Sequence, residues 1–157
     1  MELKSKIGII GQVRLECHDK DGNLLWDTGF MKNTITNACL AELSGLAGNT
    51  GSKTAFTYLA VGTDSTAESA AHTALQAETT TNGLERAAAT VSQETTTQTN
   101  DTLQLTKTWT ATGTVVVEEV GAFNAASAGT MFGRKLTTTK TVNNGETLTG
   151  TYQYIFS

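Results

Sequence analysis

Proline, cysteine, aromatic residues and charge are all scarce in this chain of 157 residues. Proline is absent, which excludes proline-rich linkers. Charged residues make up 17% of the chain and aromatic residues 6%. Cys17 and Cys39 are the two cysteines, too few for a disulfide framework. A single disulfide between them stays open, but we expect two buried free thiols in a protein made in a reducing cytoplasm.

The charge pattern argues against two classes of partner. The formal net charge is -4 and no basic cluster stands out. Binding to phosphates requires a concentrated basic surface, so we expect no nucleic-acid partner. The apolar run Ile7–Ile10 is cut off by Gln12 and Arg14 and is too short for a signal peptide or a membrane span. We therefore expect a soluble protein with no cleaved leader and no membrane partner.

Threonine is abundant, at about one residue in five, and it favours strands while remaining polar. Residues 102–112 alternate strictly. Side chains of opposite parity on a strand point to opposite faces, which predicts one apolar face and one threonine face. The apolar parity holds Leu103, Leu105, Lys107, Trp109 and Ala111. Gly113 interrupts the pattern before a second strand over 114–123, and we interpret 102–124 as the central hairpin of a sandwich.

Similar patterns predict further strands over 7–17, 24–30, 54–61, 84–91, 130–136, 137–142 and 146–157. Turn residues at 19–23 and 143–145 predict hairpins, and Asn144-Gly145 is the strongest such signal. One helix is expected over about 36–47, capped by Thr34 or Thr36 and ended by Gly45 or Gly48. Its apolar face would comprise Cys39, Leu40, Leu43, Leu46 and Ala47.

These elements predict one mainly β domain over residues 1–157, preceded by a short arm over residues 1–6. We expect an antiparallel β-sandwich or a jelly-roll-like barrel of about eight to ten strands with one short helix. The arm, or the small-residue loop 63–72, is expected to become ordered against a neighbouring molecule.

Residues capable of catalysis or metal binding do not form a recognisable set. There is no G-x-S-x-G motif, and His18 and His72 lie in unrelated contexts. Cys17 and His18 point to opposite faces of a strand, which argues against zinc. The Asp19–Asn23 segment lacks the glycine and glutamate spacing of a calcium loop. We therefore predict no catalytic residue, cofactor or metal.

Glu118 and Glu119 are adjacent carboxylates inside a predicted strand, so they cannot form a catalytic dyad. One of them is expected to point inward, where a buried carboxylate needs a donor or a partner chain. Arg86, Arg134 and Lys107 are the candidate partners. A structural or interface ion pair is the favoured interpretation over a general base.

The order of these segments resembles a family of small β-rich virion proteins of tailed bacteriophages. The likeness rests on an asparagine-flanked helix entry over 32–43, an A-V-G-T segment at 60–63, and a T-A-L-x-x-E turn at 73–78. It rests above all on a block that reads E-x-G-x-F-N-A-x-x-x-G-T-M-x-x-R. The block comprises Glu119, Gly121, Phe123, Asn124, Ala125, Gly129, Thr130, Met131 and Arg134. Asp64 stands where the family's A-V-G-T-G segment has its second glycine.

The resemblance implies a non-enzymatic structural role in the virion, after synthesis in the host cytoplasm. We expect a capsid decoration (cement) protein that forms a homo-oligomer, and a trimer is the expected state. It would bind the major capsid protein or another virion protein. A tail, fibre or collar component is the alternative. A carbohydrate-binding sandwich is a further alternative from another class, although the aromatic residues lie mostly in phase with the core. We expect a contact between Glu119 and Arg134, either buried or between subunits.

Overall fold

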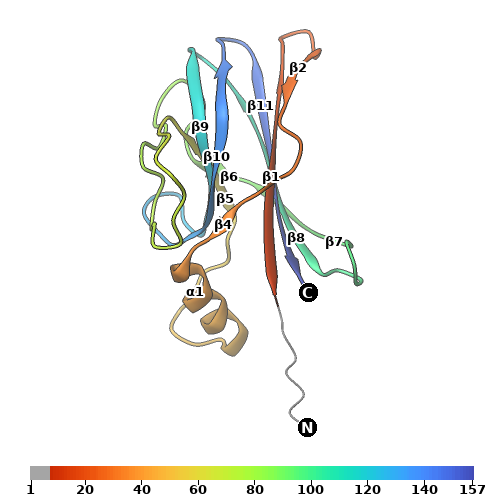
Figure 1. Cartoon of the computed structure of the whole chain (residues 1–157), viewed down its shortest axis with the longest axis vertical. Helices are drawn as coiled ribbons and strands as arrows, with labels where there is room; N and C mark the ends of the chain where they lie inside the picture. Colours follow the sequence, from red (N-terminus) through yellow and green to blue (C-terminus); the bar gives the residue numbers. More distant parts are fainter. Residues whose placement is uncertain (1–7) are drawn as a thin grey trace.

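The computed structural model describes residues 8–157 and is a sandwich of two antiparallel sheets, as Figure 1 shows. Sheet A has the order β2–β1–β11–β8–β7, and β3 also pairs with β1. Its strands are β1 (Ile9–His18), β2 (Leu24–Asp27), β3 (Met31–Lys32), β7 (Thr90–Glu94), β8 (Thr102–Thr110) and β11 (Thr147–Phe156). The predicted mainly β sandwich is confirmed, whereas the arm predicted over 1–6 lies outside the described residues.

Sheet B has the order β4–β10–β9–β5–β6. Its strands are β4 (Thr34–Ile35), β5 (Tyr58–Gly62), β6 (Ala87–Ala88), β9 (Val115–Phe123) and β10 (Met131–Val142). The described chain thus has eleven strands instead of the expected eight to ten, and three of them (β3, β4 and β6) are only two residues long. The segments 130–136 and 137–142, predicted as two strands, form one strand whose pairing with β9 shifts between Leu136 and Lys140.

The core between the sheets follows the predicted alternation. On β1, Val13, Leu15 and Cys17 are fully buried, and on β8 Leu105 and Trp109 face the same core. The C-terminal strand β11 pairs with both β1 and β8, so it is a central strand of sheet A. Its inward positions Leu148, Tyr152 and Tyr154 are fully buried.

Two predicted hairpins are wrong, because their strands belong to different sheets. Strand β8 pairs in sheet A and β9 in sheet B, so residues 111–114 cross the sandwich. The turn at Asn143–Gly145 likewise joins β10 of sheet B to β11 of sheet A. Alternation reports which face a side chain takes but not which strand lies alongside, and a few residues suffice to span sheets that pack about 10 Å apart. Within that turn only Gly145 has a positive φ, of 85°.

The helix α1 (Asn37–Gly48) lies at the lower end of sheet B in Figure 1, where it contacts β10. Thr36 caps its start by accepting a hydrogen bond from the Cys39 amide at 3.1 Å, and Asn49 ends it in the left-handed conformation. The buried face comprises Cys39, Glu42 and Gly45. Leu40, expected on that face, is 53% exposed, because the helix contacts the sandwich along a narrower stripe than its apolar residues cover.

Candidate functional site

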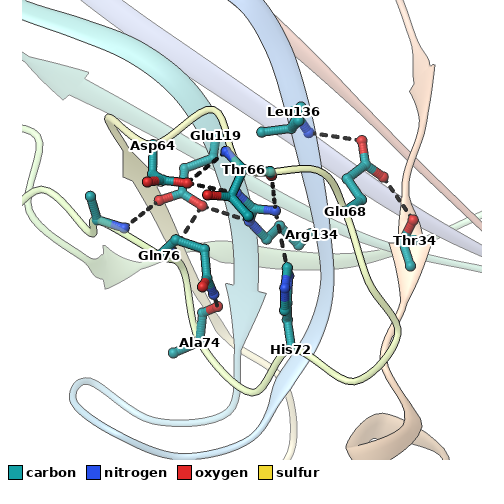
Figure 2. Close-up of polar contacts among 11 residues, drawn as sticks. Thr34, Asp64, Thr66, Glu68, His72, Ala74, Gln76, Glu119, Arg134 and Leu136 are labelled. Carbon is teal, nitrogen blue, oxygen red and sulfur yellow. Dashed lines mark hydrogen bonds and ion pairs between the residues drawn. The ribbon is translucent and has the colours of Figure 1, made fainter.

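A buried ion pair links two neighbouring strands of sheet B. Glu119 lies on β9 and Arg134 on β10, and the structure brings these two predicted residues together. The Arg134 Nε atom donates to Glu119 Oε2 at 2.6 Å, and both side chains have no exposed surface. Figure 2 shows the pair beneath a loop that crosses the outer face of the sheet.

A change of side-chain parity along β9 places Glu119 on that outer face. Val117 and Val120 both face the core between the sheets, although three positions separate them. The strand pairing shifts opposite Glu118, and this irregularity reverses the faces. Glu119 and Phe123 therefore point away from the core. The expectation that one carboxylate points into the core is wrong in this respect: Glu119 is buried, but beneath the loop.

The loop over 63–78 supplies the other partners of the pair. Glu119 accepts hydrogen bonds from the backbone amides of Gln76 at 3.1 Å and Ala77 at 2.8 Å. Arg134 donates to the carbonyl of Thr66 at 2.7 Å through Nη1, which also lies 3.5 Å from His72 Nδ1. Each residue of the pair thus holds a different part of the loop against sheet B, as Figure 2 shows.

Asp64 lies beside the guanidinium, with Oδ1 3.7 Å from Arg134 Nη2. Hydrogen bonds from Thr66 lower the pKa of the Asp64 carboxyl, and the positive charge of Arg134 lowers it further. The resembled family has its second glycine at the position of Asp64. Here the Asp64 carboxylate accepts a hydrogen bond from the Thr66 amide at 2.7 Å, which stabilises the local turn. The departure from the family pattern is therefore accommodated within the loop.

Two glycines permit this close packing. A Cβ on Gly62 would lie 2.4 Å from Glu119 Oε1 and 2.6 Å from the carbonyl oxygen of Ala77. A Cβ on Gly121 would lie 3.0 Å from Leu75, which covers Phe123 and Met131 in a second small core on the outer face. The loop can approach the sheet because these positions lack side chains.

A second contact fastens the middle of the loop. Glu68 accepts from Lys135 Nζ at 2.7 Å, from the Leu136 amide at 2.9 Å and from the Thr34 hydroxyl at 2.7 Å. Burial by itself would raise the pKa of Glu68, but these donors outweigh it and the pKa is lowered. This carboxylate was not singled out from the sequence, because its partners lie far away along the chain.

Arg86 fastens the end of the loop to the turn that follows β9. Its guanidinium pairs with Glu78, with Nε 2.8 Å from Oε1, and donates to the carbonyl of Ala128 at 2.8 Å. The guanidinium carbon also lies 3.5 Å from the centre of the Phe123 ring, a cation–π contact. Arg86 was a candidate partner for Glu119, but it instead binds Glu78. Lys107, the other candidate, is on sheet A.

The turn after β9 is joined to the helix by a buried carboxylate. Glu42 accepts from Asn124 Nδ2 at 3.0 Å and from the Thr54 amide at 3.0 Å, and its other oxygen lies 3.2 Å from Lys53 Nζ. Asn124 in turn accepts from the Thr130 amide at 2.7 Å, which closes the turn over 124–130. The hydrogen bond from Thr54 is the main reason that the pKa of Glu42 is lowered.

The remaining candidate residues are accounted for locally. Cys17 and Cys39 are free and buried, as expected, and burial raises the pKa of each thiol to about 12. The Asp19–Asn23 segment is the turn between β1 and β2, in which Asp19 binds the Asn23 amide at 2.9 Å. Within residues 8–157, no group of three or more His, Cys, Asp or Glu side chains is arranged to hold a metal ion.

The chemistry open to Glu119 is limited by its surroundings. A general base needs access to its substrate, whereas this carboxylate has no exposed surface and is occupied by two amides and a guanidinium. Trp109, Tyr152 and Tyr154 are also buried in the core and cannot line a sugar-binding groove. The contacts of Glu119 and Arg134 therefore hold the loop against sheet B.

Two open hollows border the far end of this loop. One, of about 380 Å³, is lined by residues that include Glu78, Arg86 and Ser127; the other, of about 300 Å³, is lined largely by threonines around Asn82.

None of the helices described in residues 8–157 has the length and apolar character that crossing a membrane requires. Comparisons of the chain with protein-family models, curated proteins and solved structures found no match.

Proposed function

We propose that this chain is a non-enzymatic structural component of a tailed-phage virion, and specifically a capsid decoration subunit. It would self-associate and bind the major capsid protein or another protein of the particle, after synthesis in the host cytoplasm. The proposal combines the sequence resemblance with the way in which the structure uses the residues that carry it.

The observation that carries the proposal is that the polar side chains of the Glu119–Arg134 block bind other parts of the same chain. Glu119 and Arg134 neutralise each other out of solvent. Asn124 binds Glu42 and the amide of Thr130, and Phe123 and Met131 form the small outer core. These residues fix a loop and a turn, which is the role expected of a block that specifies a fold and not a reaction.

Gly129 supports the same reading of the block. It has a φ of 74°, a left-handed conformation that glycine adopts without strain. A Cβ at this position would also lie 2.6 Å from Asn124 Oδ1. The glycine therefore permits the turn that Asn124 closes.

The outer face and the β2 edge of sheet A carry polar and exposed apolar side chains that suit contact with another protein. Its outer face carries a hydrogen-bonded row in which Gln12 donates to Gln153 and Gln153 to Gln104, each at 2.7 Å. Apolar side chains are exposed beside the β2 edge, with Leu24 at 54%, Leu25 at 47% and Phe30 at 46%. Exposed apolar groups with polar surroundings are typical of protein–protein contact surfaces.

A cryo-EM map of the phage particle whose genome encodes this chain would test the proposal. Copies of the sandwich fitted at regular capsomer junctions would support decoration. A few copies confined to the tail or collar would instead support the alternative of a tail component. Absence of the chain from purified particles, measured by mass spectrometry, would contradict both.

A further inference from the structure

The lower end of sheet A presents apolar side chains that sheet B leaves partly uncovered. Figure 1 shows the ends of β1, β11, β8 and β7 running past sheet B in this region. Ile9, Leu103 and Phe156 pack against the edge of the core and are only half-buried, and Val91 is 44% exposed. We refer to these four residues as the apolar shelf.

The apolar shelf is continuous across four strands. Ile9 pairs directly with Phe156 across β1 and β11. Leu103 pairs with Tyr154, and Val91 pairs with Leu105, so Leu103 is a diagonal neighbour of both Phe156 and Val91. Such neighbours lie within about 8 Å of one another, close enough for one extended peptide to contact all four.

The seven residues that precede Gly8 suit this shelf in sequence and in length. Gly8 pairs with Ser157 at the same end of sheet A, where the Ser157 amide donates to the Gly8 carbonyl at 3.0 Å. The preceding sequence MELKSKI has apolar residues at Met1, Leu3 and Ile7, the parity of Ile9. Seven extended residues span about 23 Å, roughly the width of five strands.

The direction of β1 argues that the occupant comes from another copy. Strand β1 begins at Ile9, and Gly8 pairs with Ser157 at the end of the sheet, so a segment before Gly8 could cover the shelf of its own copy only if the chain reversed its direction there. The segment also carries Lys4 and Lys6 against a single glutamate, whereas the whole chain has a net charge of -4. Attraction between unlike charges therefore favours binding of this segment to the remainder of the chain, whether in its own copy or in a second one.

We propose that the apolar shelf of one copy binds the N-terminal segment, residues 1–7, of a second copy. The proposal concerns self-association, which the proposed virion function includes. Its test uses purified protein without any particle, so the two can fail separately.

Crosslinking between two single-site variants tests the contact directly. A Leu3→Cys protein is mixed with a size-tagged Val91→Cys protein and treated with a short bis-maleimide; the native cysteines are buried. We expect a covalent heterodimer on a denaturing gel. Val116→Cys is the matched control and should give none, because Val116 is 41% exposed but lies on β9 of sheet B. No heterodimer with Val91→Cys, or an equal yield with Val116→Cys, would overturn the proposal.

A second measurement distinguishes binding of residues 1–7 to the shelf of another copy from binding to the shelf of the same copy. Sedimentation velocity of the full chain should show an oligomer that a deletion of residues 1–7 and a Val91→Lys substitution both convert to monomer, while Val116→Lys on sheet B leaves it intact. A full chain that is monomeric throughout, or an oligomer unaffected by the deletion, would contradict the proposal. So would a Leu3→Cys/Val91→Cys double variant that crosslinks only within one chain.

Discussion

The two outer faces of this sandwich differ in what covers them. On sheet B, residues 63–78 lie over Ala60, Phe123 and Met131 and enclose a small second core with a buried ion pair. On sheet A, within residues 8–157, the outer positions of β1, β8 and β11 carry glutamines and threonines that bind one another across the strands. A polar face can remain in water, whereas apolar outer positions require a cover.

The comparison teaches why a buried charge pair occurs on one face only in the described chain. A loop has unpaired backbone groups, and burying them against a sheet is costly unless donors and acceptors meet them. Glu119 accepts from two loop amides and Arg134 donates to a loop carbonyl, so one pair satisfies both kinds of group. The pair allows an irregular segment to be packed as if it were another layer of the fold.

The largest expected effect comes from removing one partner of the buried pair. Glu119→Ala would remove the buried partner of Arg134 and leave only the partly exposed Asp64, 3.7 Å away, to offset its charge, which costs about 3–5 kcal/mol of unfolding free energy. Glu118→Ala is the matched control, because that neighbouring carboxylate accepts only from the exposed hydroxyl of Thr139; we expect a change of less than about 1 kcal/mol there. Urea denaturation measures both, and equal midpoints for the two variants would contradict this role of the pair.

Filling the close approach between loop and sheet should have the next largest effect. Gly62→Ala places a Cβ 2.4 Å from Glu119 Oε1, and the resulting strain costs about 1–3 kcal/mol. Gly48→Ala is the control, since its Cβ would have only ordinary contacts at 3.6 and 3.7 Å with Thr50. Thermal unfolding should show a lower Tm for the first variant and a similar or higher Tm for the second. A Gly62→Ala protein as stable as the parent would show that the loop is not tightly packed.

Acid should loosen the loop through Glu68, whose pKa is lowered from its ordinary 4.5. A lowered pKa means that the carboxylate stabilises the folded chain above pH 4.5 and that this contribution is lost as the pH falls through the folded-state value. At pH 7, Glu68→Gln should cost about 1–2 kcal/mol. The difference between the parent and the variant should shrink as the pH falls below 4.5. Denaturation curves between pH 7 and pH 3 test this, and a difference independent of pH would contradict it.

Sheet A offers the corresponding acid test on an exposed pair. Hydrogen bonds from Arg14 lower the pKa of Asp27 from its ordinary 3.8 to about 2, so its contribution should be present above pH 3.8 and be lost as the pH falls towards 2. Asp27→Asn should nevertheless change the stability by less than about 1 kcal/mol at neutral pH, because surface ion pairs contribute little. The same denaturation series measures it. A loss as large as that of Glu68→Gln would remove the distinction between the two faces.

The smallest effect is expected in the polar row of sheet A. Gln153 bridges Gln12 and Gln104 with bonds of 2.7 Å, but all three side chains are partly exposed and water can replace these bonds. Gln153→Thr, which keeps strand preference, should change the unfolding free energy by less than about 1 kcal/mol. Chemical denaturation checks this. A large loss would show that the outer face of sheet A is also structurally required.

Period-two alternation in the sequence predicted most strands and their buried faces, as on β1, β8 and β11. It could not predict strand partners, and so the segments around 111–114 and 143–145 were taken as hairpins within one sheet. Partner choice depends on contacts that are distant in sequence, which local periodicity does not contain. The reversal of faces between Val117 and Val120 was also invisible, because both residues suit either face.

The candidate site was predicted in part. Glu119 and Arg134 stood out because a carboxylate inside an apolar strand requires a partner. Glu68 and Lys135 did not, since charged residues in loops and on strand faces need no explanation. The signal available in the sequence was Gly62 at the end of a strand pattern, because a glycine there permits another part of the backbone to approach closely.

Hydrogen exchange at the amide of Ala77 tests most directly whether the buried pair holds the loop. In the parent chain this amide donates to Glu119 Oε1 at 2.8 Å, so we predict slow exchange by NMR although Ala77 lies in a loop. In Glu119→Ala the Ala77 amide should exchange much faster, beyond the change seen at the core amide of Tyr152. Fast exchange at Ala77 in the parent chain, or equal changes at Ala77 and Tyr152, would contradict the account.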